Sequence, residues 1–320
     1  IPSPAPCVFI PVYGSRCVRA FPPRGQRDGT FPMPYFSSGL DLPDDSLAVD
    51  LHLHSNASDG EDPPRRVMER AKAAGLRVVS LTDHDTVAGL DEARRESGRL
   101  ELEFVDGVEL SSIHRGRIVH MLGHFIRPAD PELSDRMRRY MGSRKTRVAE
   151  MIGRLGGLGI SIDPDDFFRE YGGAASIGRG QLSAYMLKKN LVGHREEIFE
   201  KFLGEEASAY VELDMISPAE AVRLIAGAGG AATFAHPNLS GVDEIIPDLV
   251  SAGLAGIEAE HPSQDADEQK KYREMAKCYN LVAMGGSDCH GSRPGPERLG
   301  QYSQPVRTFL ELRRKASGAD

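Results

Sequence analysis

Two histidines at alternate positions, His52 and His54, stand at the end of a short apolar run that begins at Ser46. The run predicts a strand, and because strand side chains alternate between faces, both imidazoles should point the same way. Neutral imidazole is the commonest protein ligand for transition metals, and a carboxylate follows at Asp59. The stretch therefore has the residue types for half a metal site, although a His-x-His also occurs at water-facing strand ends.

Residues of the same types recur where later strands are expected to end. The candidate ligands at these ends are His84, Glu109, His120, His236, Asp288 and His290. Strands are predicted over 77–81, 103–110, 117–125, 231–235, 256–260 and 281–285, with helices over 63–74 and 217–228. In a parallel α/β barrel the strand ends meet on one rim, where such enzymes hold their active sites. Each residue alone has an ordinary explanation, such as a helix cap or a solvated side chain, but together they favour one shared site.

Composition limits the classes of function. The 320 residues are 40% hydrophobic, enough for one large α/β domain or for a barrel with a small insertion. The net charge of −8, from 39 basic and 47 acidic residues, argues against a general nucleic-acid coat or an anionic membrane surface as partner. No apolar run approaches the ~20 residues of a membrane helix. The four cysteines form no Cys-x-x-Cys pair, so we expect a reducing, cytoplasmic setting.

Three regions are expected along the chain. Residues 1–46 hold nine of the 21 prolines and show no periodicity, which predicts a disordered leader; an artefact of the start site is the alternative. Residues 47–146 and 215–320 are expected to form the barrel. Residues 147–214 are expected to form a helical insertion, with helices over 147–158, 185–190 and 194–202.

The ordered motifs resemble the polymerase and histidinol phosphatase (PHP) family. They are His52-x-His54, Asp59, Thr82-Asp83-His84-Asp85, Gly107-Val108-Glu109, Val119-His120-Met121-Leu122-Gly123, Ala235-His236-Pro237 and Gly286-Ser287-Asp288-Cys289-His290. The resemblance spans residues 49–291 and is greatest to stand-alone phosphoesterases acting on nucleoside monophosphates, 3′,5′-bisphosphonucleotides and the 5′ ends of short RNA. It implies an α/β fold, a distorted (β/α)7 TIM-like barrel with a small helical cap.

The resemblance also implies three divalent metal ions. The ligand sets it implies are His52, His54, Glu109 and Asp288 for the first ion, Glu109, His120 and His236 for the second, and Asp59, His84 and His290 for the third. The carboxylate at Asp59 favours a harder ion, so manganese is preferred, with zinc or iron as alternatives. His114 and His124 compete with His120 for its role, and the Val-His-Met-Leu-Gly motif favours His120.

Clustered divalent ions neutralise charge on a phosphoryl group and acidify a bound water, which then attacks in line with the leaving oxygen. The resemblance implies that Glu109, Asp288 and His236 hold this water. Asp83 or Asp85 could orient a ligand imidazole from behind. Asp85 could equally cap a helix beginning near Thr86.

Within the insertion, Ser176-Ile177-Gly178-Arg179 resembles the family's Gly-Arg-Pro-His segment, with Gly180 and Gln181 in place of Pro-His. Arg179 and Gln181 are therefore expected at the substrate, Arg179 at a phosphate, while Gln181 cannot carry a proton. The basic run 136–147 is either a solvated helix face or a means of steering a polyanion.

The expected partner is a small phosphorylated substrate, a nucleotide or the 5′ end of single-stranded RNA, without duplex nucleic acid or membrane. The oligomeric state stays open. Histidinol-phosphate hydrolysis and a non-catalytic metal-binding PHP module are the alternatives.

Overall fold

The computed structural model describes residues 43, 45–171, 177–204, 206–212, 215–291 and 298–318, so almost all of the expected leader lies outside the described residues. The strands are β1 (Leu47–Leu53), β2 (Val78–Leu81), β3 (Glu103–His114), β4 (Arg117–His124), β5 (Ala231–Phe234), β6 (Gly256–Glu260), β7 (Val282–Gly285) and β8 (Gln304–Pro305). The helices are α1 (Pro64–Ala73), α2 (Leu90–Arg99), α3 (Pro131–Gly157), α4 (Pro164–Tyr171), α5 (Arg179–Lys188), α6 (Arg195–Ile198), η1 (Phe199–Leu203), α7 (Pro218–Gly227), α8 (Pro237–Ser240), η2 (Asp243–Ile245), α9 (Ile246–Ala252), α10 (Ala266–Tyr279) and α11 (Val306–Ser317).

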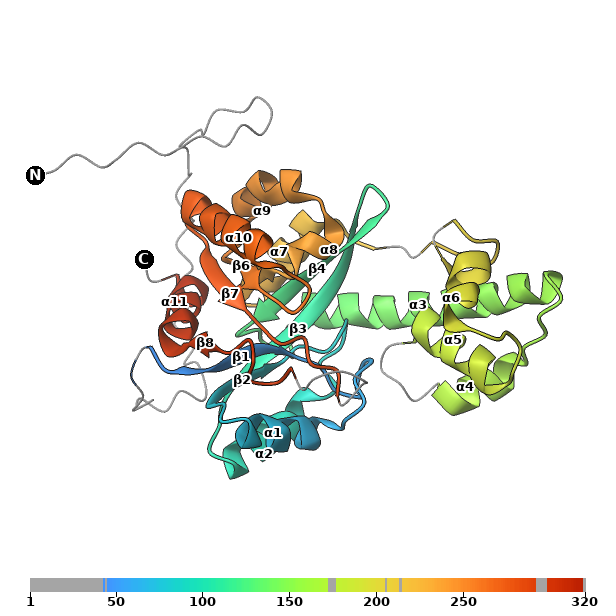
Figure 1. Cartoon of the computed structure of the whole chain (residues 1–320), viewed down its shortest axis with the longest axis horizontal. Coiled ribbons are helices and arrows are strands. Elements are labelled where there is room, and N and C mark those ends of the chain that lie inside the picture. Colours follow the sequence, from blue (N-terminus) through green and yellow to red (C-terminus); the bar gives the residue numbers. More distant parts are fainter. Residues whose placement is uncertain are drawn as a thin grey trace, which may run out of the picture. The chain divides into compact units, whose positions relative to one another are not determined.

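The strands form one curved sheet in the order β7-β6-β5-β4-β3-β2-β1-β8 (Figure 1). Beyond β7 the chain bridges back to β1, where the backbone N–H of His54 donates to the carbonyl of Cys289 at 3.1 Å. This contact brings the two sides of the sheet together into a nearly closed barrel. The predicted α/β barrel fold is confirmed.

One expectation about the strands is wrong. β4 runs antiparallel to both β3 and β5, whereas a parallel arrangement was expected throughout. The reason is the connection between β3 and β4, because only Arg115 and Gly116 separate them, both with positive φ (48° and 81°). Such a two-residue turn matches the twist of an antiparallel hairpin and is too short for a parallel crossover. β8, which was not predicted, is antiparallel to β1.

Helices cover the sheet and complete two hydrophobic cores. α1 and α2 lie side by side, α1 against β2 and α2 against β3 (Figure 1), and their apolar faces bury Val67, Met68 and Ala93. α7, α9 and α10 contribute to a second core with β3 to β6. α1 and α7 fall where they were predicted, since each has Pro at its first turn and an apolar stripe at helical spacing.

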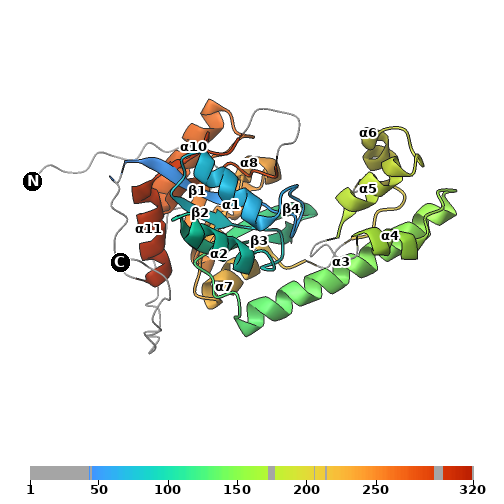
Figure 2. The ribbon, with the colours of Figure 1, turned by 90° about the horizontal axis from the view of Figure 1, so that it is seen from below.

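Beyond β4 the chain enters one 27-residue helix, α3, not a helix beginning at residue 147 (Figure 2). Asp130 starts it, because this carboxylate accepts the backbone N–H groups of Glu132 and Leu133. The basic run 136–147 is therefore the middle of α3. Among the described helices, none is both long and apolar enough to cross a membrane.

The second half of α3 packs with α4, α5, α6 and η1 around a separate apolar cluster. This cluster includes Val148, Phe167, Leu182 and Ile198. The expected helices over 185–190 and 194–202 correspond to the end of α5 and to α6 with η1, while α4 was not predicted. The insertion boundary at residue 147 falls inside α3, and the division into barrel and insertion stays a prediction.

Candidate metal centre

A single buried carboxylate, Glu109 in the middle of β3, lies among five imidazoles. Its Oε2 is 3.2 Å from His52 Nε2, 3.1 Å from His54 Nε2 and 3.3 Å from His84 Nδ1. Its Oε1 is 3.0 Å from both His120 Nδ1 and His236 Nε2. The residues predicted at separate strand ends therefore converge on one point.

Strand pairing explains this convergence. The segment after β2 keeps pairing with β3, since the backbone N–H of Asp85 donates to Glu109 O at 2.9 Å, and this places His84 beside Glu109. His120 sits in β4 opposite Ser111, so it reaches the centre from within an antiparallel strand instead of from a carboxyl end. Gly107 permits the close approach of β2, because a Cβ there would lie 2.3 Å from Ser80 Oγ.

A second carboxylate, Asp288, follows β7 and faces the same imidazoles. Its Oδ1 is 3.1 Å from His54 Nε2 and 3.3 Å from His52 Nε2, and its backbone has a positive φ of 48°. Asp288 and Glu109 thus both contact the His52–His54 pair. The two histidines share a face of β1, as their alternate spacing predicted.

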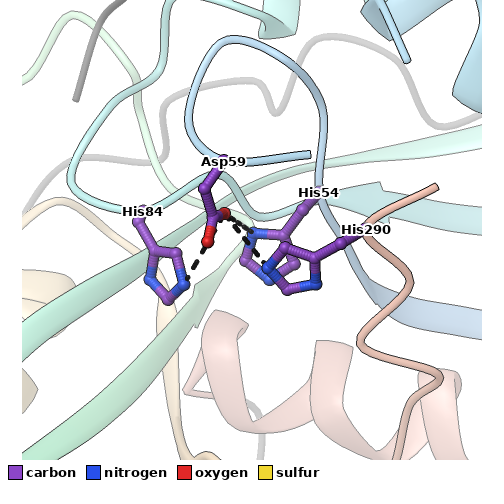
Figure 3. A group of neighbouring side chains, drawn as sticks. All are labelled: His54, Asp59, His84 and His290. Atoms are coloured by element: carbon purple, nitrogen blue, oxygen red, sulfur yellow. Dashed lines mark ion pairs between the residues drawn. The ribbon is translucent and has the colours of Figure 1, made fainter. Parts of the chain in front are cut away.

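An outer group surrounds Asp59, which is more exposed than the inner carboxylates (Figure 3). Its Oδ1 lies 3.0 Å from His290 Nε2 and 4.0 Å from both His84 Nε2 and His54 Nδ1. In Figure 3 the four side chains point toward one another from the ends of β1, β2 and β7 and from the loop that carries Asp59. His54 and His84 therefore touch both the inner and the outer group.

The charges of this centre are strongly coupled. Burial alone would raise the pKa of Glu109, but the imidazoles of His84, His120 and His52 outweigh it and hold that pKa well below the usual range. Asp288 behaves in the same way, since His52 and His261 outweigh its burial and lower its pKa. Burial lowers the pKa of His84 to about 4, so this imidazole is neutral at neutral pH.

The donor set fits divalent metal ions. Imidazole nitrogens and carboxylate oxygens that converge within about 3.3 Å supply the mixed nitrogen and oxygen ligands that such ions bind. Both ring nitrogens of His54 and Nδ1 of His84 are buried without a hydrogen-bond partner. Buried polar atoms of this kind require a partner, and a metal ion supplies one.

Among the described residues, four groups of side chains have their ligand atoms close enough to share an ion. They are His52, His54, Glu109 and Asp288; His54, Asp59, His84 and His290; His84, Glu109 and His120; and His52, Glu258 and His261. The first equals the set implied for the first ion, and the second adds His54 to the set implied for the third. The third group differs from the set implied for the second ion, because it contains His84 in place of His236. His236 still contacts Glu109 directly.

Two residues at this centre were missed by sequence reasoning, Glu258 on β6 and His261 just after it. Glu258 Oε1 is 2.9 Å from His52 Nδ1, and His261 Nε2 is 3.3 Å from Asp288 Oδ2. Both are buried. The available signal was the predicted strand over 256–260, which contains Glu258 and is followed directly by His261.

The competing histidines lie outside these groups. His124 is buried, and its Nε2 is 2.9 Å from the carbonyl of Leu51, while burial lowers its pKa to about 4. His114 ends β3 opposite Arg117 in the hairpin.

The carboxylates of Asp83 and Asp85 accept hydrogen bonds from serines. The described residues show no hydrogen bond between either carboxylate and an imidazole. Asp83 accepts from Ser58 Oγ at 2.6 Å and from Ser55, so it holds the loop that carries Asp59. Asp85 accepts from the backbone and hydroxyl of Ser111 and pairs with Arg144 of α3. It does not cap a helix near residue 86, since α2 begins at Leu90.

The centre opens into a pocket of about 500 Å³. Asp59, His84 and His120 line it together with four arginines, which are Arg144, Arg147, Arg179 and Arg195. Gln181 also lines the pocket, and its Oε1 accepts the backbone N–H of Gly178 at 2.9 Å, so the side chain caps α5. The pocket lining thus combines candidate metal ligands with positively charged side chains.

An α/β barrel that gathers such ligands beside an anion-attracting pocket has the features of a metal-dependent hydrolase of phosphorylated compounds. The family model of the PHP domain matches residues 50–207 of this chain. A 3′,5′-nucleoside bisphosphate phosphatase of Chromobacterium violaceum is 32% identical over 276 residues, covering 83% of this chain and 97% of that protein. The chain therefore belongs to the PHP family of phosphoesterases.

Other relatives differ in the reaction they are named for. A 5′-3′ exoribonuclease of Haemophilus influenzae is 32% identical, covering 75% of this chain and 89% of that protein. A phosphoribosyl 1,2-cyclic phosphate 1,2-diphosphodiesterase of Eggerthella lenta is also 32% identical, covering 77% and 95%. A solved structure from Bifidobacterium adolescentis, described as a metal-dependent phosphoesterase, is 27% identical with a TM-score of 0.75, covering 84% of this chain and 96% of that one.

Proposed function

We propose that this phosphoesterase releases a terminal phosphate from a nucleotide, or a nucleotide from the 5′ end of single-stranded RNA. The observation that carries the proposal is the pocket that the candidate metal ligands line together with Arg144, Arg147 and Arg179. A substrate whose phosphate ester lies at the candidate metal ligands would place its other anionic groups beside the arginines. The names of the nucleotide phosphatase and exoribonuclease relatives support this substrate class.

We propose that the centre holds three divalent ions, with manganese preferred to zinc or iron because Asp59 adds a hard oxygen ligand. His52, His54, Glu109 and Asp288 would hold the first, Glu109, His120 and His236 the second, and Asp59, His84 and His290 the third. When bound, such ions offset phosphoryl charge and lower the pKa of a water molecule. Glu109, Asp288 and His236 would border the position of that water.

The arginines supply the substrate-binding part of the proposal. Arg147 and Arg179 both lie over the ring of Tyr210, with guanidinium carbons 5.2 and 5.5 Å from its centroid. Burial, followed by the nearby charge of Arg179, lowers the pKa of Arg147 to about 10. Like charges held this close repel one another, so a bound phosphate would relieve an existing repulsion.

Replacing Arg179 by alanine should raise KM for a nucleotide substrate by roughly 10- to 100-fold, because a hydrogen bond to a charged group contributes about 1.5–3 kcal/mol. Steady-state kinetics separate this from a loss of kcat, which would instead indicate a contact made in the transition state. Arg169 of α4 is the matched control, since its exposed side chain pairs with Asp166 away from the pocket lining. Equal KM values for R179A, R169A and the parent enzyme would exclude Arg179 from substrate binding.

Duplex DNA should resist this enzyme. We infer that α3 to α6 act as a cap over the ligands, because Arg144 of α3 pairs with Asp85 beside the centre, and two flanking strands would collide with such a cap. The net charge of −8 also opposes the many phosphate contacts that a duplex-binding protein needs. Incubation with circular duplex DNA is the measurement; rapid cutting by the parent enzyme, with His52→Ala inert, would contradict the substrate proposal.

A screen of manganese-loaded protein separates the candidate substrates. Hydrolysis of a 3′,5′-bisphosphonucleotide, a nucleoside monophosphate or 5′-phosphorylated single-stranded RNA supports the proposal, whereas preference for a cyclic phosphate diester or for histidinol phosphate replaces it. The diester is included because the Eggerthella lenta relative is named for one. A chain that binds metal but hydrolyses none of these would be the non-catalytic module.

A further inference from the structure

Glu258 lies behind the metal-type ligands, where both of its carboxylate oxygens are engaged. Oε1 is 2.9 Å from His52 Nδ1, and Oε2 accepts the backbone N–H of His236 at 2.7 Å. The side chain is 1% exposed. We propose that Glu258 is a positioning residue that holds His52 and His236 together in the geometry needed to bind metal. This proposal rests on the metal-dependent function above.

The contact with His52 selects its tautomer. A carboxylate can only accept, so His52 Nδ1 carries the proton and donates it to Glu258. The lone pair of a neutral His52 then lies on Nε2, the nitrogen that is 3.2 Å from Glu109 Oε2 and 3.3 Å from Asp288 Oδ1. A histidine that donates its second nitrogen to a carboxylate is also more basic, and therefore a better metal ligand.

The contact with His236 holds a strained backbone. His236 has φ 26° and ψ 61°, a left-handed conformation that a residue with a side chain adopts only when its surroundings enforce it. Its N–H, which donates to Glu258, lies at the start of α8. This conformation directs His236 Nε2 to Glu109 Oε1, 3.0 Å away. Without the Glu258 carboxylate, His236 would lose the hydrogen bond that compensates its backbone strain.

The two contacts link both oxygens of Glu109. His52 faces Oε2 and His236 faces Oε1, and their rings stack with centroids 5.8 Å apart and an interplanar angle of 24°. One carboxylate on β6 thus sets the spacing of two ligands from different strand ends.

A direct ligand role is the competing explanation, since Glu258, His52 and His261 lie close enough to share an ion. The position of His52 argues against it, because its Nε2 already faces Glu109 and Asp288, which leaves Nδ1 to donate to Glu258 Oε1 instead of binding an ion there. His261 contacts a different carboxylate, that of Asp288. Its Nδ1 accepts the backbone N–H of Ser263 at 3.1 Å, so its Nε2 carries a proton and faces Asp288.

The test measures manganese affinity in the whole protein without any substrate, so it fails or succeeds independently of the proposed reaction. Glu258→Ala removes both contacts and should weaken Mn²⁺ binding by about 10- to 100-fold, the usual effect of losing such a partner. Glu258→Gln keeps an acceptor for His52 but offers an amide N–H group to His236, so its affinity should be intermediate. Glu260→Gln is the control, because Glu260 sits on the same strand and binds Arg273 and Gln304.

Thermal unfolding of the metal-free proteins accompanies the titration, because a merely structural role would lower the unfolding temperature without a matching loss of affinity. Parent-like affinity in Glu258→Gln, or an ion count reduced by one with normal affinity for the rest, would overturn the proposal, the second result in favour of a direct ligand. The isosteric glutamine variant decides the matter if the alanine variant does not fold.

Discussion

Glu109→Gln should abolish hydrolysis and reduce the bound metal while the fold persists. Among the described residues, Glu109 is the one carboxylate within 3.3 Å of five imidazoles, and glutamine keeps its shape but removes its charge and places an amide N–H group on one oxygen position. Two ions would lose their shared ligand at once, so turnover should fall by a factor of about 10³ or more, as when one group that stabilises transition-state charge is removed.

Elemental analysis of the purified variant, with phosphate release under saturating manganese, measures both effects. Circular dichroism shows whether the barrel is intact. Glu103→Gln, at the start of the same strand and away from the centre, is the matched control and should keep its metal and its activity. Full metal retention together with normal turnover in Glu109→Gln would end the three-ion assignment.

Gly286→Ala should also inactivate the enzyme, although no ligand is removed. A Cβ at this position would lie 2.5 Å from His52 Cβ and 3.0 Å from Glu258 Oε1. To relieve the clash, either His52 or the backbone at Gly286 must move, and overpacking of this kind costs about 1–3 kcal/mol. We therefore expect weaker manganese binding, with activity reduced by roughly 100-fold even at saturating metal, because a small misplacement of catalytic groups is costly.

Gly142→Ala is the control for this substitution. Gly142 lies inside α3, where an added Cβ meets nothing within 4 Å, so alanine there should raise stability by about 0.5–1 kcal/mol through its helix propensity. Manganese titration and unfolding curves of the two variants give the comparison. Parent-like metal affinity in Gly286→Ala would mean that His52 can shift without leaving its ligand position.

Local sequence patterns were sufficient to predict the fold class and to name most of the candidate ligands. The alternation of His52 and His54 depends only on strand geometry, and it predicted correctly that both rings face the same way. The helices α1 and α7 follow from an apolar stripe with proline in the first turn. The order of the motifs along the chain predicted the family, which the relatives confirm.

Tertiary structure decided what depends on pairing between distant segments. The direction of β4, and hence how His120 arrives at Glu109, follows from the tight turn at Arg115 and Gly116 and from two neighbouring strands. The contact of Glu258 could not be predicted, because a carboxylate within a strand is ordinary until His52, 206 residues away, lies against it. Sequence spacing describes which side chains share a face of one element, whereas contacts between elements depend on packing.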